Sequence, residues 1–530
     1  MSGRESFDPI QRATVLFQHD PLRVRIIASY LAIFVCCAPA WWYLTSITRL
    51  PLPTARVEQL GWTEDVKFPL NIAITRSSSD ERVRRSNEAE VEHALHARIQ
   101  HADPAWHTLD VRISSAEGQL ANENSTDTFI VAIVDYLAGA SHLVGDHTLS
   151  LAGDSANASQ IIDLLQELLL PYASRRHEVD QQRVAKYSPR YRLAFTLLNE
   201  DVSTSGFHSW EIQEAIQDYL EPTLKQLRSL HEFEIETQVQ YFAPLGFESE
   251  RRADDEGQQF HALSSEELKV FVNSAEWSLA SSVSADPVLH FILFVPSARH
   301  SPTHVINSQG NAAQSNAFII PQWGGIVVLN PSTPHGQQLD VHTLLPVFKT
   351  FHKHLQLLLG ISGIPRGTFH VPTSSQPLTK WQLSALQRWR TLENVREATD
   401  ALRSTIKLIH RIGHLPVKED VRTFVNAALD DLDELRGALA RPHASLARAF
   451  DAARDASVHA SSAFFHPGML AMLYFPPEHT YAVYGPLFAY VGVTLLSALV
   501  REIQRVRKER EQNHRRMEKD KGRKEGERSE

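Results

Sequence analysis

Two long apolar runs lie near the ends of the chain, at residues 26–47 and 480–500, and neither contains a charged side chain. As α-helices rising about 1.5 Å per residue, they would be about 33 and about 31 Å long, which matches the hydrocarbon core of a bilayer. Trp41, Trp42 and Tyr43 stand near the end of the first run, where an aromatic belt is expected at a membrane surface. The pattern predicts one transmembrane helix near each end.

The first run has an alternative interpretation as a cleaved signal peptide. Ala38-Pro39-Ala40 has the small-x-small form of a cleavage site. However, the apolar run continues well beyond these residues, and the flank before residue 26 is only weakly basic. These features favour a retained membrane anchor.

The charges that flank the two runs orient the predicted helices. Residues 501–530 hold 12 basic and 8 acidic side chains, and two arginines closely precede the first run. Because positively charged flanks favour the cytosol, we expect both termini there and residues 50–479 on the lumenal side. The N-x-[ST] triplets at Asn124 and Asn157 fall in this region and are candidate N-glycosylation sites.

Between the two runs, strand-like and helix-like patterns alternate, which is typical of a sheet flanked by helices. The strand candidates are residues 68–75, 128–136, 191–201, 232–244, 288–297 and 316–331. The helix candidates are residues 81–101, 158–172, 209–229 and 339–359. Polar loops are expected at 76–82, 250–265 and 298–316. We predict an α/β lumenal domain with a mixed β-sheet.

The same patterns predict how the strands are buried. EIETQVQYF at 234–242 alternates with period two, so this strand should have one solvated face. FILFV at 291–295 and FIIP at 318–321 are continuously apolar, which predicts burial on both faces.

From residue 378 the spacing of apolar residues becomes helical, and a first stripe runs from Leu383 to Ile409. A second stripe runs from Val421 to Leu439, and an alanine-rich segment follows. Such stripes favour core packing over a partner-binding groove. The expected layout is a cytosolic N-terminus (1–25), a transmembrane helix (26–47), a lumenal α/β domain (50–377), a lumenal helical arm (378–479), a second transmembrane helix (480–500) and a charged cytosolic tail (501–530).

Composition excludes some functions. The formal net charge is -9, and the acidic excess lies between the two apolar runs, which argues against nucleic-acid binding there. The two cysteines, Cys36 and Cys37, are adjacent in the first run. Beyond them the chain can form no internal disulfide, no thiolate metal site and no cysteine nucleophile.

Standard motifs for catalysis and cofactor binding are absent: the chain has no G-x-S-x-G, H-E-x-x-H, G-x-x-x-x-G-K-[ST] or G-x-G-x-x-G. His352 and His354 are two apart on a predicted helix, so their imidazoles should point in different directions. The acidic run at residues 430–434 is interleaved with leucine and indicates a solvated helix face. We predict no catalytic residue, cofactor or metal, although a triad assembled from dispersed residues stays open.

A distinctive local feature is Pro-Gln-Trp-Gly-Gly, which separates two apolar runs. Gly324 and Gly325 permit either the close approach of a ligand or a sharp turn. A strand pattern follows them rather than a helix start, which excludes a phosphate cradle. Pro321 cannot donate to a central ladder, so we expect a bulge or bend between two buried strand segments. Trp323 is then expected to pack over the glycines, with ligand stacking as the alternative.

Four stretches together resemble a known family, in order and at similar places. They are PAWWYLTSITRLPLP (39–53), NAFIIPQWGGIVVLNP (316–331), LTKWQLSALQRWRTLENVREAT (378–399) and FFHPGMLAMLYFPPEHTYAVYGPLF (464–488). The chain resembles the PIG-S subunit family of the GPI transamidase complex from the first apolar run to the last. Leu-Tyr-Phe-Pro-Pro-Glu-His and Pro-Gln-Trp-Gly-Gly are the most specific parts.

The resemblance implies a non-catalytic subunit in the endoplasmic reticulum membrane, with two spans and a lumenal domain. The complex would transfer GPI anchors to the C-terminus of precursor proteins, and a caspase-like partner subunit would carry the catalytic cysteine. This chain would scaffold that assembly, whether it contacts GPI lipid and precursor itself or only through other subunits. The lack of any cysteine after residue 37 agrees independently.

Two other functions are compatible with the residues. A stand-alone lumenal receptor for glycans or peptides could use Trp323 as a stacking platform. A lumenal hydrolase would need carboxylates with perturbed pKa values that converge in a pocket.

Overall fold

The computed structural model describes most of the chain. The described ranges are 20–45, 49–59, 66–76, 104–115, 128–134, 142–152, 157–173, 183–253, 257–264, 286–307, 310–313, 315–331, 335–365, 369–370, 377–412, 417–440, 445–469 and 477–526, with single residues at 93, 94, 97, 137, 267 and 415. The chain divides into two compact units, which are described separately. The larger contains Thr54–Arg403 and Val425–Ser461, and the smaller contains Met1–Pro53, Ser404–Phe424 and Ser462–Glu530.

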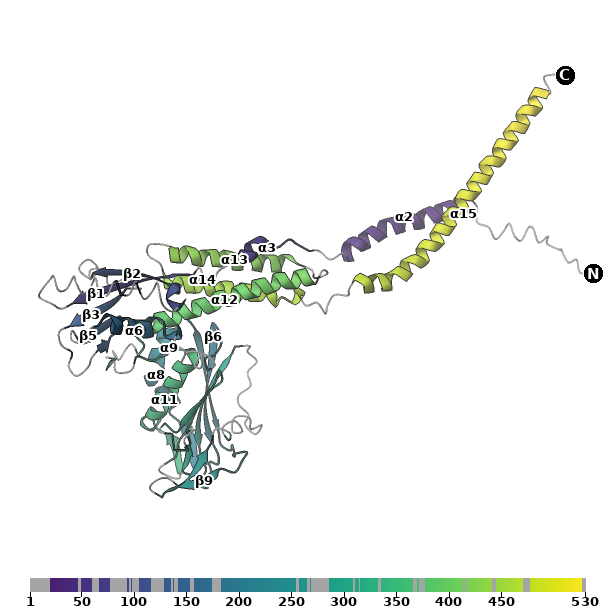
Figure 1. Cartoon of the computed structure of the whole chain (residues 1–530). Coiled ribbons are helices and arrows are strands. Elements are labelled where there is room, and N and C mark those ends of the chain that lie inside the picture. Colours follow the sequence, from purple (N-terminus) through teal and green to yellow (C-terminus); the bar gives the residue numbers. More distant parts are fainter. Residues whose placement is uncertain are drawn as a thin grey trace, which may run out of the picture. The chain divides into compact units, whose positions relative to one another are not determined.

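A five-stranded sheet in the larger unit has the order β13-β14-β11-β6-β8. Its strands are β6 (Arg190–Asn199), β8 (Glu232–Gln240), β11 (Val288–Val295), β13 (Ala317–Ile320) and β14 (Gly324–Val328). β8, β6, β11 and β14 are parallel, and β13 is antiparallel to β14. The helices α8 (Ile212–Tyr219), α9 (Glu221–Leu227) and α11 (Val341–Leu359) pack their apolar residues on one face of the sheet. These helices and strands form the main core (Figure 1).

A six-stranded sheet in the same unit has the order β16-β4-β5-β3-β1-β2. Its strands are β1 (Phe68–Arg76), β2 (Leu109–Ser115), β3 (Thr128–Val134), β4 (His142–Val144), β5 (Thr148–Ala152) and β16 (Phe369–His370), accompanied by the helix α6 (Ala158–Leu169). Two small sheets add β9 (Glu250–Ala253), β10 (Gln259–Leu263) and β12 (Thr303–Val305), and β7 (Gly206–Trp210) with β15 (His335–Leu339).

Three long helices follow the sheets: α12 (Lys380–Arg411), α13 (Glu419–Ala440) and α14 (Leu446–Phe464). The first turns of α12 contact both large sheets. Trp381 stacks on Phe129 of β3 at 4.1 Å between ring centroids, and Leu386 packs into the core of the five-stranded sheet. Because both sides of this helix segment meet protein, most of its residues are buried.

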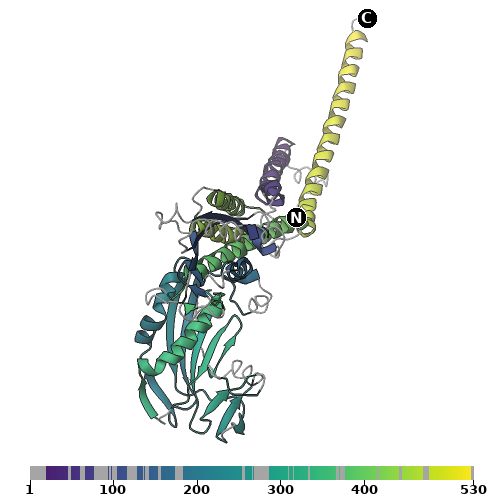
Figure 2. The same cartoon turned by 60° about the vertical axis from the view of Figure 1, so that its left-hand side comes forward.

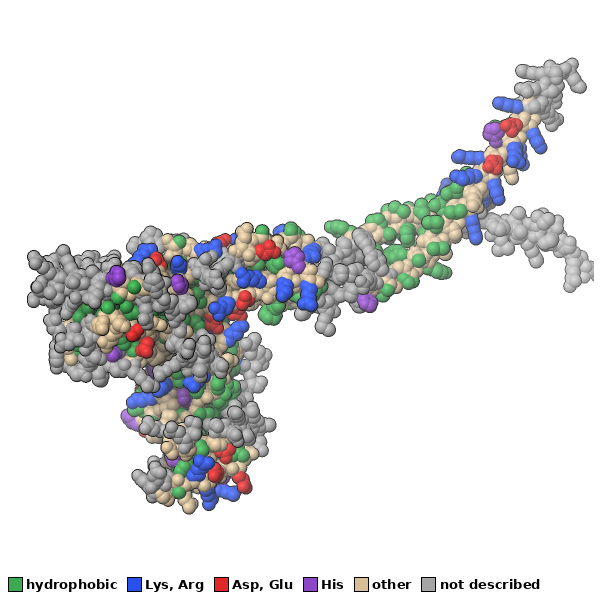
Figure 3. Space-filling model, viewed as in Figure 1, with side chains coloured by type: hydrophobic (Ala, Val, Ile, Leu, Met, Phe, Trp, Pro, Cys, Tyr) green, Lys and Arg blue, Asp and Glu red, His purple; other side chains and the backbone are tan. Residues whose placement is uncertain are grey.

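The smaller unit contains the two apolar helices, α2 (Asp20–Thr45) and α15 (Pro477–Gly526). Phe488 of α15 contacts the rings of Phe34 and Trp41 on α2, at 6.1 and 4.9 Å between centroids. Hydrophobic side chains cover the outside of both helices, and Lys and Arg gather farther along α15 (Figure 3). Each helix has a stretch apolar and long enough to cross a membrane, within Val24–Trp41 and Ala482–Lys519. Figure 2 shows α15 as one uninterrupted helix.

The predicted mixed α/β fold is confirmed, although the described strands belong to two large and two small sheets rather than to one. Residues 209–229 form two helices instead of one, because Pro222 restarts the chain as α9, and β7 occupies the beginning of this range. The polar range 250–265 contains β9 and β10, and 298–316 contains β12. Most of the helical pattern at 81–101 lies outside the described residues.

The two edge strands, β8 and β13, are less buried than their sequences predict. β8 has no buried residue on either face, because it is the last strand of its sheet. β13, which contains FII of the FIIP run, is only half-buried because it forms the opposite edge. FILFV in the sheet centre is fully buried, as predicted.

Candidate functional site

The Pro-Gln-Trp segment forms a hairpin turn. β13 and β14 run antiparallel, with Ile320 opposite Gly324, and the Trp323 N–H donates to the Ile320 carbonyl at 3.2 Å. Gln322 takes the left-handed region at φ 62°, which tightens the turn. The chain therefore reverses direction here, where the sequence favoured a bulge or bend between two strand segments, and the paired glycines open the second strand.

Neighbouring atoms leave no room for a side chain at either glycine, whereas the backbone dihedral angles would allow one. A Cβ on Gly324 would lie 2.0 Å from the carbonyl oxygen of His290 on β11. A Cβ on Gly325 would lie 2.0 Å from Nδ1 of His354 on α11. Both spaces are filled by protein, so no ligand approaches the backbone at this point.

Trp323 lies beside this turn and is partly buried. Its ring stacks on His290 at 4.6 Å with 25° between the planes, and it packs against the buried cluster that contains Ile292 and Ile326. Burial, together with nearby Arg192, lowers the pKa of His290 to about 4, so the imidazole is neutral at pH 7. One face of the Trp323 ring is therefore already covered by a neutral side chain.

Of the two candidate glycosylation sites, only Asn157 lies in the described residues. It is exposed at the N-cap of α6, where its Oδ1 accepts a hydrogen bond from the Ser159 N–H at 3.4 Å. Asn124 lies outside the described residues.

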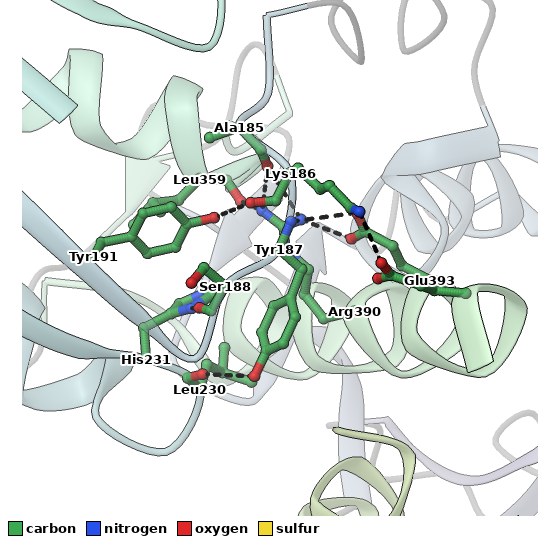
Figure 4. Close-up of polar contacts among 11 residues, drawn as sticks. Ala185, Lys186, Tyr187, Ser188, Tyr191, Leu230, His231, Leu359, Arg390 and Glu393 are labelled. Atoms are coloured by element: carbon green, nitrogen blue, oxygen red, sulfur yellow. Dashed lines mark hydrogen bonds and ion pairs between the residues drawn. The ribbon is translucent and has the colours of Figure 1, made fainter. Parts of the chain in front are cut away.

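Arg390 on α12 is the centre of a buried polar cluster (Figure 4). It is fully buried and donates to three acceptors: the Leu359 carbonyl at 2.9 Å, the Ala185 carbonyl at 3.3 Å and Glu393 Oε2 at 2.7 Å. Its guanidinium also lies 4.6 Å from the centroid of the Trp389 ring. The charge thus fastens α12 to the end of α11 and to the segment that precedes β6.

Tyr187 in the segment before β6 and Tyr191 at the start of β6, both drawn in Figure 4, hold this segment in place. The Tyr187 hydroxyl donates to the Leu230 carbonyl at 3.2 Å, and the Tyr191 hydroxyl donates to the Lys186 carbonyl. Burial raises the pKa of Tyr187, and it raises that of Tyr191 to about 12. Both phenols therefore stay protonated donors at neutral pH.

His231 lies between these two tyrosine rings, at 5.2 Å from Tyr187 and 5.1 Å from Tyr191. Its Nδ1 lies 2.7 Å from the Ser188 carbonyl and donates to it. Burial and the positive charge of Arg390 lower the pKa of His231 to about 3. Tyr187, Tyr191, His231 and Arg390 each donate to a backbone carbonyl of the chain itself, so the cluster acts as a structural joint.

The sequence did not reveal this joint. Arg390 lies in LTKWQLSALQRWRTLENVREAT, but a stripe of apolar residues indicates only which face of a helix is buried. Here ten of the fifteen residues from Trp381 to Val395 are buried, because sheets lie on more than one side. The scarcity of acidic residues before Glu393 was the only available signal.

A second polar cluster lies at the carboxyl ends of β6 and β11. Glu200 is buried and accepts from the Ser297 N–H at 2.7 Å, and it pairs with His300 Nδ1 at 2.5 Å. Ser249 Oγ lies 2.7 Å from Nδ1 of His261, whose ring contacts the His300 ring at 5.1 Å. In a catalytic triad, the carboxylate bonds to the histidine that bonds to the serine. Here Glu200 bonds to His300 and not to His261, so Ser249, His261 and Glu200 do not form a triad.

The potential metal ligands include His352 and His354 on α11 and the two cysteines of α2. Within the part of the chain that the structure describes, no group of three or more His, Cys, Asp and Glu side chains could hold a metal ion. Cys36 and Cys37 are free and exposed on α2. His352 and His354 point to different neighbours: His352 Nε2 lies 2.8 Å from Thr223 Oγ1, whereas His354 faces Gly325.

An open groove of about 880 Å³ lies beside β8, on the side of α8 and α9. Its apolar lining includes Ile216 and Leu224 from the helices and Phe233 and Ile235 from the strand. Its charged lining includes Glu221, Lys225 and Arg228. A groove of this kind suits a segment of protein with apolar side chains.

The family described as "Phosphatidylinositol-glycan biosynthesis class S protein", or PIG-S, matches residues 28–509 of this chain. The chain belongs to the PIG-S family. The mouse protein named GPI-anchor transamidase component PIGS is 28% identical over 89% of this chain and 93% of its own length. A human protein of the same name is 27% identical over 89% and 93%, respectively.

The similarity extends beyond mammals. The Schizosaccharomyces pombe protein named GPI transamidase component PIG-S homolog is 27% identical over 91% of this chain and 84% of its own length. The family resemblance carried by the four quoted stretches is therefore confirmed. In this PIG-S member, residues 316–331 contain the hairpin, and the stretch at 378–399 contains Arg390.

Proposed function

We propose that this chain is a non-catalytic, scaffolding subunit of a GPI transamidase complex in the endoplasmic reticulum membrane. The family match over residues 28–509 is the observation that carries the proposal. Relatives that cover nearly the whole chain are named as components of this transamidase. The partners are then the other subunits, including a caspase-like catalytic subunit. GPI lipid and precursor proteins would be bound mainly by those subunits.

Three features support a non-catalytic role. The chain has no cysteine after residue 37, so it lacks a lumenal thiol for a thioester intermediate. Glu200 bonds to His300 and leaves the pair of Ser249 and His261 without its carboxylate. The buried Arg390 donates to the carbonyls of Ala185 and Leu359 and to Glu393, which suits a rigid support.

The proposed topology places α2 and α15 in the membrane, with both termini in the cytosol and the large α/β region, followed by the helical arm, in the lumen. The lengths and exposed apolar surfaces of the two helices support this arrangement. The basic second half of α15 supports a cytosolic C-terminus. Asn157 is exposed, as a lumenal glycosylation acceptor must be.

Native purification tests the subunit proposal. The tagged full chain, extracted in mild detergent, should bring down the caspase-like catalytic subunit in an amount comparable to its own. Cells lacking the chain should accumulate precursor proteins without a GPI anchor. Recovery as a lone monomer, with normal anchoring in the deleted cells, would reject this function and favour a stand-alone receptor.

Topology has a separate test. In sealed microsomes, a tag after residue 530 should be digested by added protease, while the region from β1 to α14 stays protected. On a gel, Asn157→Gln should migrate faster than the wild-type chain by the mass of one glycan. After glycosidase treatment, the two chains should migrate alike. A protected C-terminal tag would show that the orientation is reversed.

A further inference from the structure

β8 forms one edge of the five-stranded sheet and is unusually open for its length. It pairs with β6 along all nine of its residues. Within the described ranges, no strand pairs with its other side. β13 at the opposite edge has only four residues. An edge as long as β8 exposes a row of unpaired backbone donors and acceptors, which is a template for another strand.

The hydrogen bonds show which backbone groups point outward. The Glu232 N–H donates to the Pro189 carbonyl at 2.8 Å, so Glu232 directs its backbone groups toward β6. Because direction alternates along a strand, Phe233, Ile235 and Thr237 direct their N–H and C=O groups away from the sheet. These three residues provide the ladder positions for an added strand.

The side chains of the same three residues line the groove. Phe233 packs on the edge of the main core, and Ile235 is 40% exposed. Ile216 and Leu224 form the facing wall. A strand added to β8 would direct alternate side chains into this groove, where apolar side chains would lose contact with water.

The opposite face of β8 carries three glutamates at alternate positions. Glu232 pairs with Arg190 at 2.9 Å, and Glu236 pairs with Arg192 at 2.7 Å. Glu234 lies between them, is exposed and makes no ion pair with any described residue. A basic side chain on an added strand would find its acidic partner at this position.

We propose that β8 accepts an added β-strand from another subunit of the transamidase complex. That strand alternates, with apolar side chains toward Ile235 and a lysine or arginine toward Glu234. Backbone bonds to Phe233, Ile235 and Thr237 give affinity, and the groove and Glu234 give specificity. This inference rests on the proposed function, because it takes its partner from the same complex.

Hydrogen exchange on the intact complex tests the inference without any substitution. The amides of Ile235 and Thr237 should exchange at least about tenfold more slowly in the assembled complex than in the isolated full chain in detergent, since each becomes a ladder donor. Glu232, whose amide is already bonded to Pro189, serves as the internal control and should change little. Equal exchange of Ile235 and Thr237 in both samples would overturn the inference.

Thr237→Pro gives a second test, because proline removes an outward N–H while leaving the bonds to β6 in place. Recovery of the partner subunit should fall about tenfold or more. Thr237→Ala keeps the backbone N–H and is the matched control, so it should reduce recovery much less than Thr237→Pro does. If Thr237→Pro lowers the melting temperature, Glu234→Lys replaces it; this exposed change should also reduce recovery, and normal recovery would overturn the proposed charge match.

The outcomes separate this inference from the proposed function. Failure of the wild-type chain to recover any transamidase subunit would reject the function itself. Normal recovery by wild type, Thr237→Pro and Glu234→Lys alike would reject only the β8 site. If the complex contains two copies of this chain and Thr237→Pro removes one of them, the added strand comes from a second copy, and the proposed partner subunit is wrong.

Discussion

An interior strand, β14, and an edge strand, β8, of the five-stranded sheet differ in how many of their backbone groups are hydrogen-bonded within the sheet. β14 is buried at all five positions and bonds to β11 on one side and β13 on the other. β8 has no buried residue, and among the described strands it bonds only to β6. Both strands belong to the same parallel set.

This difference between β14 and β8 predicts that β14 contributes to folding stability and β8 to partner binding. In β14 every contact is internal, so a change there should alter folding first. In β8 half of the backbone groups point away from the sheet, so a change there should alter partner binding while folding is retained. Substitutions in the two strands can therefore test whether this division is correct.

Gly324→Ala should have the largest effect. The new methyl group would meet the backbone of His290, which cannot move without disturbing β11, so we expect destabilisation of about 5 kcal/mol or more and loss of folded protein. Gly325→Ala is the matched comparison, because its methyl group meets a histidine side chain that can rotate. Expression and thermal unfolding measure both. Equal stability of the two variants would contradict the close approach at Gly324.

Arg390→Met should come next. It leaves the carbonyls of Ala185 and Leu359 without their donor and Glu393 without its cation, at a cost of about 3–5 kcal/mol. Lys186→Ala is the control, since its ion pair with Glu397 is exposed and should contribute less than about 1 kcal/mol. Chemical denaturation of the full chain in detergent measures the difference. A loss below 1 kcal/mol for Arg390→Met would show that the joint is not structural.

Acidification should destabilise the same interior by a smaller amount. The folded-state pKa values of His231 and His354 are lowered by burial to about 3 and about 4. Their stabilisation is complete above the unfolded pKa of about 6.5 and decreases as pH falls toward the folded values. At pH 5 each contributes a loss of up to about 2 kcal/mol relative to pH 7.

The melting temperature, measured from pH 7.5 to 4.5, should fall below pH 6.5 and stay nearly constant above it. His231→Gln should lower stability at pH 7 but reduce the slope at acidic pH, because one buried titrating group is gone. An unchanged slope in this variant would indicate that His231 titrates normally in the folded protein.

Glu234→Gln should have the smallest effect on folding. The side chain is exposed and lies outside the ion pairs of Glu232 and Glu236, so the free energy of unfolding should change by less than about 0.5 kcal/mol. Partner recovery should decrease and become less sensitive to salt. If Glu234→Gln lowered stability as much as Arg390→Met, the proposal that β8 contributes little to folding would be wrong.

The sequence predicted the elements whose patterns are set locally. β6, β11 and α11 were expected within a few residues of their bounds, because their apolar residues follow strand or helix spacing. β9, with the sequence ERRA, was missed because an exposed edge strand contains no apolar pattern. β7 was missed because GFHSW adjoins a helical pattern, and its pairing with β15 is a long-range contact.

The structural role of the paired glycines was only partly predictable. A turn or bend follows from Pro321 and the glycines themselves. The requirement for glycine depends on His290 and His354, which come from β11 and α11 and are distant in sequence. The position of Arg390 depends in the same way on Ala185 and Leu359. Local patterns contain no information about such neighbours.

The length of α15 has a mechanical consequence. The helix runs without a break from Pro477 to Gly526, about 75 Å at 1.5 Å per residue. A rigid rod transmits torsion: turning its apolar half about the axis turns its basic half by the same angle. Inserting one residue near Arg501 would rotate everything beyond it by about 100° and leave composition almost unchanged. The helix could thus convey a rotation of the span to whatever touches the charged end.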